Sequence, residues 1–221
     1  RLYFAIGVPF EAAWLDKIAA ANPAMQVVPT DRGIRKLPMA AHRHPAAEPP
    51  RHDDHDHDHG IPDPHIWLAP LLVKHQAQTI CEALQAADPA HSAAYAANLR
   101  RFVADIEALD GALRAMFDGK AGQQFMVFHP SWGYFAAAYG LEQVPVEIEG
   151  KDPKPAQLQA LIEHAREREI RVIFVQPQFS TRSAELLARE IGGRVVFADP
   201  LAADWAANLK AVAAQVAASL R

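Results

Sequence analysis

Short, unbroken runs of hydrophobic residues recur along the chain. Strands covered on both faces of a parallel sheet have this pattern, because neither face meets water. The runs predict strands at residues 2–8, 25–29, 125–128, 144–148, 172–175 and 194–197.

Between these runs, hydrophobic residues stand three or four positions apart, which is typical of helices with one buried face. This spacing predicts helices at residues 10–21, 68–87, 90–117, 132–139, 155–169, 183–191 and 208–220. The helix at 90–117, with Asp88 as its N-cap, would be roughly 40 Å long at about 1.5 Å per residue and could connect two lobes. The alternation of strands and helices predicts an α/β fold in which helices cover parallel sheets.

One stretch, at about residues 40–62, follows neither pattern. Residues 40–64 hold five prolines and a single large apolar residue, Ile61. A segment of this composition cannot bury enough apolar surface to offset the entropy lost on folding. We therefore expect a disordered loop.

The overall composition narrows the class of protein. Half of the 221 residues are hydrophobic, which suits a substantial core in one large domain or two small ones. The net charge of −4 argues against a nucleic-acid partner, and the chain lacks the run of about eighteen apolar residues that a membrane span requires. The sequence opens at Arg1 directly on a hydrophobic run. We therefore expect the natural N-terminus, with any signal peptide, to be missing.

Histidine is concentrated in the predicted loop. Seven of the eleven histidines lie between His42 and His65, and His alternates with Asp towards His59. Imidazole and carboxylate groups both bind borderline divalent metals such as Zn²⁺. The pattern predicts an auxiliary, low-affinity metal loop, unless the loop is merely solvated or a remnant of engineering. Its ligands would be His42, His44, His52, His55, His57 and His59.

Polar residues stand where predicted strands end. In open α/β sheets, ligands bind beyond the carboxyl ends of the strands, and His129, Gln176 and Asp199 all follow predicted strands. His65 precedes a predicted helix just after the loop. Two imidazoles and a carboxylate, from His65, His129 and Asp199, would form a partial zinc site. Each could instead have a structural role, as a hydrogen-bonded residue or a cap.

No common catalytic motif is present. The chain lacks G-x-S-x-G, G-x-x-x-x-G-K-[ST], H-E-x-x-H and C-x-x-C. Cys81 lies within a predicted helix, and Glu147 and Glu149 fall near no candidate ligand. Three further histidines are expected on exposed helix faces, without a role: His75, His91 and His164.

A family resemblance is carried by several segments taken in order. They are L-Y-F-A-I-G-V-P-F-E, D-P-H-I-W-L-A-P after a His-rich insertion, F-H-P-S-W-G-Y-F, V-I-F-V-Q-P-Q-F-S and A-D-P-L. The chain resembles the ZnuA/TroA-like metal solute-binding proteins of bacterial ABC importers. The resemblance implies two β/α lobes joined by a long rigid helix. Residues 1–87 would form a partial N-terminal lobe with the loop, 88–118 the connecting helix and 119–221 the C-terminal lobe.

The same resemblance implies a ligand set. His65 and His129 would be the family's second and third metal ligands, and Asp199 matches a position that supplies a carboxylate in many members. The family's first ligand lies in a P-H-x-Y-E-P-type segment, which this sequence lacks. We therefore expect an incomplete N-terminal lobe and weaker metal binding than in an intact receptor.

The resemblance further implies a function. The protein would be a periplasmic receptor that captures zinc with high affinity, with Mn²⁺ less favoured, and delivers it to a membrane permease without catalysis. It would be a monomer, with a periplasmic metallochaperone as a further partner. Two alternatives stay open: a metal-dependent hydrolase on an α/β core, and a metallochaperone or adhesin on the same fold.

Overall fold

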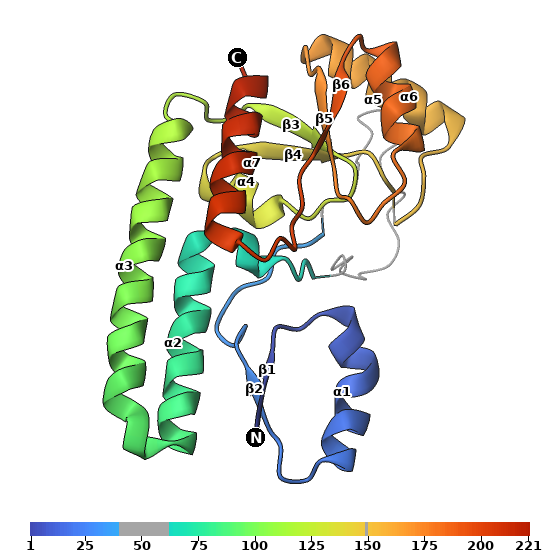
Figure 1. Ribbon diagram of the computed structural model, residues 1–221. Helices are drawn as coiled ribbons and strands as arrows, with labels where there is room; N and C mark the ends of the chain where they lie inside the picture. The colour runs from blue at the N-terminus through green and yellow to red at the C-terminus, as the bar shows by residue number, and fades with distance from the viewer. Residues whose placement is uncertain (40–61, 149) are drawn as a thin grey trace, which may run out of the picture. The chain divides into compact units, whose positions relative to one another are not determined.

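The computed structural model describes residues 1–39, 62–148 and 150–221 (Figure 1). The six histidines of the predicted auxiliary loop, and Glu149, lie outside these residues. Between the named strands every pairing is parallel, so the predicted α/β class is confirmed.

The described chain divides into two compact units. One consists of Arg1–Lys36 and Pro64–Ala112, and the other of Leu113–Arg221 with the described residues of Leu37–Asp63. The lobe and connecting-helix boundaries expected from the sequence stay a prediction.

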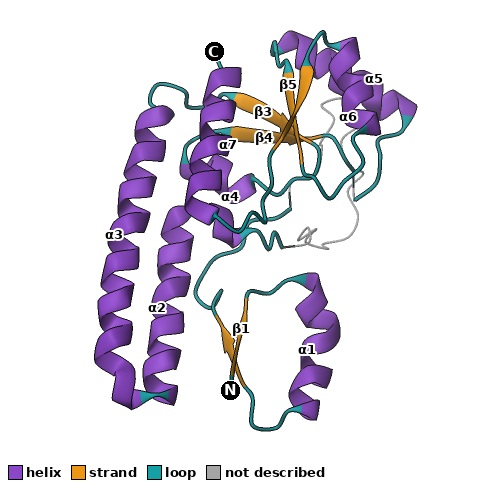
Figure 2. Ribbon diagram, viewed as in Figure 1, coloured by secondary structure: helices purple, strands orange, loops and turns teal. Residues whose placement is uncertain are grey.

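The first unit begins with a small parallel sheet (Figure 2). Strands β1 (Leu2–Ala5) and β2 (Gln26–Pro29) pair in parallel and are joined by helix α1 (Pro9–Ala21). The buried carboxylate of Glu11 accepts hydrogen bonds from the backbone N–H groups of Ile6, Gly7 and Val8. These bonds fix the turn that leads the strand into the helix.

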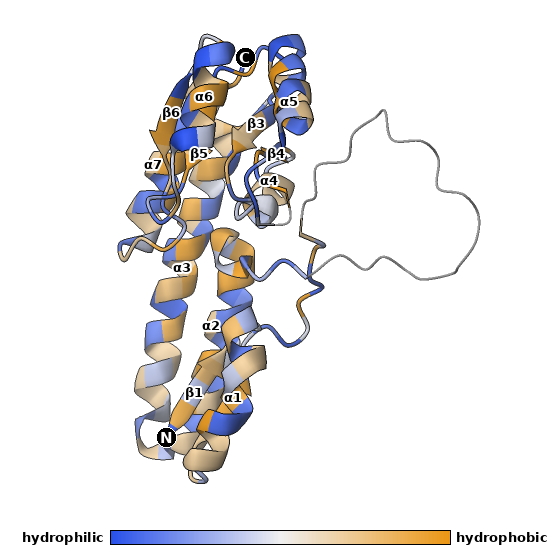
Figure 3. Cartoon of the chain, turned by 90° about the vertical axis from the view of Figure 1, so that its right-hand side faces the viewer, coloured by the Kyte–Doolittle hydropathy of each residue, from blue (hydrophilic) through white to orange (hydrophobic). Residues whose placement is uncertain are grey.

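Two long helices lie side by side, and the second continues from this unit into the other (Figures 1 and 3). They are α2 (Pro70–Ala87) and α3 (Ser92–Met116), and a short 3₁₀ helix, Pro89–His91, precedes α3. Asp88 is the N-cap residue of this 3₁₀ helix rather than of α3, and its side chain makes no capping hydrogen bond there. Its carboxylate accepts a hydrogen bond from Tyr95 Oη at 2.8 Å and pairs with His91 Nδ1 at 2.7 Å. The long helix is therefore confirmed, with a tighter turn before it.

The second unit is a four-stranded parallel sheet in the order β4-β3-β5-β6. The strands are β3 (Gln124–Val127), β4 (Glu142–Pro145), β5 (Val172–Val175) and β6 (Arg194–Phe197). The helices that follow or precede them are α4 (Gly133–Ala138), α5 (Pro155–Glu167), α6 (Arg182–Glu190) and α7 (Trp205–Ser219).

Alternate strand residues build the core of this unit on both faces of the sheet. Met126 and Ile173 face a cluster that includes Leu161 of α5 and Leu187 of α6. Their neighbours point the other way, where Phe125 packs edge-on against Phe174 and against Phe135 of α4. Packing on both faces restrains the sheet, and with it the side chains at its carboxyl edge. None of the helices within the described residues is long and apolar enough to cross a bilayer.

Candidate metal centre

His129 directly follows β3, at the carboxyl edge of the second unit's sheet. Its Nδ1 lies 2.6 Å from Oε1 of Glu147, a carboxylate that is only 5% exposed. A carboxylate can only accept a hydrogen bond, so the ring nitrogen is the donor. Hydrogen bonds from a ring N–H to a carboxylate are shorter than those between neutral groups.

The backbone of His129 is held as firmly as its ring. The side chain of Gln176, buried at the end of β5, accepts from His129 N–H at 3.4 Å and donates to the His129 carbonyl at 3.0 Å. The same amide donates to the Ser131 hydroxyl at 2.8 Å. The sequence placed Gln176 and His129 at one rim of the sheet, and the structure confirms that they meet.

An aromatic ring covers one face of the His129 imidazole. The ring of Phe179 is stacked on it, with centroids 5.0 Å apart and planes inclined by 16°. Phe179 lies in the turn after β5, where its N–H donates to the Gln176 carbonyl at 3.1 Å. The imidazole is thus restrained in its plane by Glu147 and across its plane by Phe179.

The sequence prediction did not identify Glu147 as a neighbour of His129. The predicted strand at 144–148 placed this residue inside a strand, whereas β4 ends at Pro145. In the parallel register Val127 lies beside Pro145, and Glu147 N–H bonds the Phe128 carbonyl at 3.0 Å. Two residues past each strand end, this register places Glu147 beside His129.

Asp199 lies on the same edge of the sheet, beyond β6, and its bonds reach both its own turn and the turn after β5. Its Oδ1 accepts from Gln178 Nε2 at 3.0 Å and from Leu201 N–H at 2.9 Å. Its carbonyl accepts from Asn208 Nδ2 at 2.8 Å. The bond from Leu201 N–H stabilises the turn at Asp199; the prediction of Asp199 as a ligand stays a prediction.

His65 belongs to the first unit and stands at the start of a 3₁₀ helix, Ile66–Leu68. Ile66 and Leu68 are fully buried, which anchors the helix, and the His65 ring packs against Trp67 with centroids 5.2 Å apart. Within the residues that the structure describes, no three or more His, Cys, Asp or Glu side chains are grouped to hold a metal. The ligand set of His65, His129 and Asp199 therefore stays a prediction.

Two of the three helical histidines are not exposed, contrary to the prediction. His75 is half-buried, with Nε2 2.7 Å from the Arg32 carbonyl. His164 is half-buried, with Nε2 2.9 Å from Gln124 Oε1; burial, assisted by the Arg168 charge, lowers the pKa of His164. His91 is exposed, as predicted.

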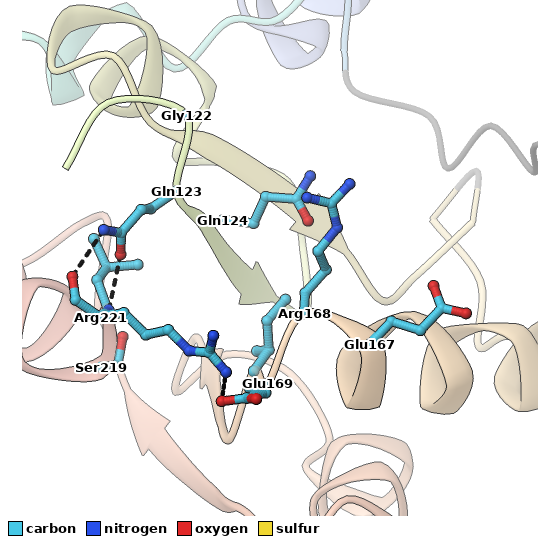
Figure 4. A pocket seen from close by; sticks show the side chains of 10 residues that line it. Gly122, Gln123, Gln124, Glu167, Arg168, Glu169, Ser219 and Arg221 are labelled. Carbon is cyan, nitrogen blue, oxygen red and sulfur yellow. Dashed lines mark hydrogen bonds and ion pairs between the residues drawn. The ribbon is translucent and has the colours of Figure 1, made fainter.

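A pocket of about 360 Å³ lies at the opposite edge of the same sheet, near the start of β3 (Figure 4). It is lined in part by Gln123 and Gln124, and an ion pair between Arg221 and Glu169 crosses it. The Gln123 amide also bonds the backbone of Arg221. This pocket has no lining residue in common with the surroundings of His129.

Comparisons with known proteins agree on one family. A family model described as ZnuA, zinc-uptake complex component A periplasmic, matches residues 1–218. The high-affinity zinc uptake system protein ZnuA of Bacillus subtilis (strain 168) is 32% identical over 134 residues, which are 60% of this chain and 42% of that protein. The zinc-binding lipoprotein AdcA of Streptococcus pneumoniae serotype 4 is 28% identical over 157 residues, 67% of this chain and 31% of that protein. The chain spans less than half the length of these two relatives.

Solved structures show the same similarity. A crystal structure of ZnuA is 42% identical, with a TM-score of 0.87, and the match covers 99% of this chain and 78% of that chain. A laminin-binding adhesin from Streptococcus agalactiae is 21% identical, with a TM-score of 0.79, and covers 100% of this chain and 80% of its own. At that identity the second match shows the fold alone.

Proposed function

Because the chain belongs to the ZnuA family of periplasmic zinc-uptake components, we propose that it captures zinc in the periplasm and delivers it to the membrane permease of an ABC importer. The family is a metal-binding transport component rather than a family of enzymes. Zinc is therefore the cargo, and we expect no chemical turnover.

The observation that carries this proposal is the setting of His129. A metal-bound histidine typically donates its other ring N–H to a carboxylate, which orients the ring and makes it a better ligand. His129 has such a partner in Glu147, on a rigid sheet edge. Imidazole nitrogen favours Zn²⁺ over hard cations such as Mg²⁺, and it suits Mn²⁺ less well than carboxylate does.

We further propose His65 and Asp199 as ligands beside His129. His65 follows directly on D-P, and the buried 3₁₀ helix behind it fixes its backbone. Asp199 is the weaker candidate, because Gln178 and the turn at Leu201 already compete for its Oδ1. It would bind the ion through its other oxygen or by releasing Gln178.

A titration of zinc against a competing chromophoric chelator tests the ligand set. We expect His129→Ala and His65→Ala to weaken binding by more than the about 10- to 100-fold that losing a ligand's hydrogen-bond partner costs, and Asp199→Ala to weaken it less. His91→Ala is the matched control, because His91 is exposed and its ring nitrogen pairs with Asp88 at the start of its own helix. Unchanged affinity in His129→Ala would overturn the proposed site.

The auxiliary role of the His-rich segment is a separate proposal, made on its sequence alone. Its six histidines, four of them interspersed with aspartate, would collect further zinc ions at low affinity. Deleting residues 41–60 should lower the number of bound zinc equivalents and leave the tightest one in place. An unchanged stoichiometry would show that the segment does not collect zinc.

The transport role is tested in cells rather than by binding. A bacterial strain that lacks its own zinc receptor should grow in zinc-poor medium when it carries this sequence together with its cognate permease, and not with the His129→Ala variant. We propose the permease as the main partner, a periplasmic metallochaperone as a further partner, and a monomer as the working form. Binding to laminin without any zinc-dependent growth would favour an adhesin on the same fold instead.

A further inference from the structure

We propose that Glu147 is a positioning residue for zinc capture: it fixes the tautomer and the orientation of the His129 ring, so that Nε2 is the nitrogen that binds the ion. This inference rests on the proposed function, in which His129 is a zinc ligand. It assigns a task to a buried carboxylate that would otherwise have none.

The tautomer follows from the chemistry of the contact. Neutral imidazole carries one proton, on either Nδ1 or Nε2, and a metal binds the nitrogen that lacks it. An ionised carboxylate can only accept, so the 2.6 Å approach of Glu147 Oε1 to Nδ1 points to the proton at Nδ1. Nε2 then holds the lone pair that zinc needs. Without the carboxylate, both tautomers would be populated, and part of the protein would present the wrong nitrogen.

The position of the carboxylate is determined by the sheet. Glu147 follows β4 and continues the register in which β4 pairs with β3. Its own N–H donates to the Phe128 carbonyl at 3.0 Å. Its side chain is buried, so few other positions are open to it. The carboxylate oxygen that contacts the imidazole is therefore positioned by the backbone before the ion binds.

Two further contacts keep the ring from turning away from this carboxylate. Gln176 binds both the N–H and the carbonyl of His129, which fixes the backbone from which the ring projects. Phe179 stacks on one ring face and blocks rotation to that side. A ligand that is already oriented loses little entropy on binding, so more of the interaction energy appears as affinity.

The experiment compares two substitutions of Glu147 with a matched control. Glu147→Gln keeps an oxygen that can accept from Nδ1 but removes the charge, whereas Glu147→Ala removes both. Glu142→Gln makes the same change at the start of β4, where the carboxylate accepts a hydrogen bond from Gln124 Nε2 at 2.8 Å. Zinc affinity is measured by chelator competition, and the His129 tautomer in the metal-free protein by long-range ¹H–¹⁵N NMR of the imidazole. Thermal unfolding reports whether each variant folds.

We expect Glu147→Ala to lose about 10- to 100-fold in zinc affinity and to show a mixture of tautomers at His129. Glu147→Gln should keep the Nδ1–H tautomer with a smaller loss, and Glu142→Gln should match the wild type. A merely structural role would change the unfolding temperature but not the tautomer. If Glu147→Ala does not fold, the wild-type tautomer and Glu147→Gln still decide the question.

The possible failures are distinct. If His129→Ala loses zinc while Glu147→Ala keeps its affinity and the Nδ1–H tautomer, the positioning role is wrong and the proposed function stands. If Glu147→Gln loses as much affinity as His129→Ala, Glu147 is itself a ligand and the positioning role is again wrong. If His129→Ala binds zinc as well as the wild type, the ligand assignment fails and the positioning role fails with it.

Discussion

Among single residues, His164 on α5 is one whose protonated form is disfavoured in the folded protein. Burial lowers its pKa below the usual 6.5, and the nearby positive charge of Arg168 lowers it further, while Glu167 acts in the opposite direction. The unfolded chain therefore binds more protons than the folded one just below pH 6.5, and stability is lost as the pH falls through that range.

Substitution of His164 should remove this pH dependence. We expect the wild type to lose more unfolding free energy between pH 7.5 and pH 5.5 than His164→Gln, which cannot be protonated there. The effect will be modest, because the ring is only partly buried. Urea denaturation at the two pH values measures it, and equal losses in the two proteins would contradict the assignment to His164.

Some residues of the candidate site could be predicted from local sequence patterns, whereas others required knowledge of the strand order. His129 and Gln176 could be placed at one edge because each follows a hydrophobic run, which can be identified locally. Glu147 could not, because its neighbour depends on the order β4-β3 and on a strand end at Pro145. Likewise, the exposure of His75 and His164 depends on what the rest of the chain packs against their helices.

At the scale of elements, the pairing of β6 with β5 depends on a glycine. Gly193 precedes β6, and a Cβ atom there would overlap the Arg171 carbonyl, which accepts a hydrogen bond from Arg194 N–H at 2.8 Å. Gly193→Ala would push the two strand starts apart and should cost about 1–3 kcal/mol. Chemical denaturation measures the loss.

Gly111 in α3 provides the matched control. It is exposed, and a Cβ atom there meets nothing within 4 Å. Because alanine favours a helix interior over glycine, Gly111→Ala should stabilise the protein by up to about 1 kcal/mol. A Gly193→Ala variant as stable as the wild type would show that the strands can part at this point without cost.

Elements were easier to predict than their ends. Every strand and helix expected from the hydrophobic pattern occurs in the described residues, because burial on one or both faces dictates the pattern. The ends of helices and strands differ from the prediction where tertiary contacts compete with the local sequence preference. The start of the long helix is an example, since a 3₁₀ helix with Asp88 at its N-cap precedes α3, and the Asp88 side chain bonds those of His91 and Tyr95.

At the scale of the whole molecule, the class of fold could be predicted, but the arrangement could not. Alternating strands and helices require parallel sheets, whereas the order β4-β3-β5-β6 involves crossovers that no local pattern reveals. The edge that gathers His129, Gln176 and Glu147 depends on that order. The fold was thus more predictable than the full surroundings of the site.

The proposed zinc site should couple ion binding to the stability of the whole chain. An ion that binds only the folded state stabilises it by about 2.7 kcal/mol when its concentration is 100 times the Kd. Zinc should therefore raise the unfolding temperature of the wild type, and a chelator should reverse the rise. His129→Ala should show a much smaller rise.

The His-rich segment should behave differently in the same experiment. Its histidines are close together in sequence, with several between His52 and His59, so the unfolded chain can also use them to bind zinc, and such binding adds little stability. Deleting residues 41–60 should leave the zinc-dependent rise in unfolding temperature intact while it lowers the number of ions bound. If the deletion abolished the rise, the stabilising ion would be held by this segment and not at His129.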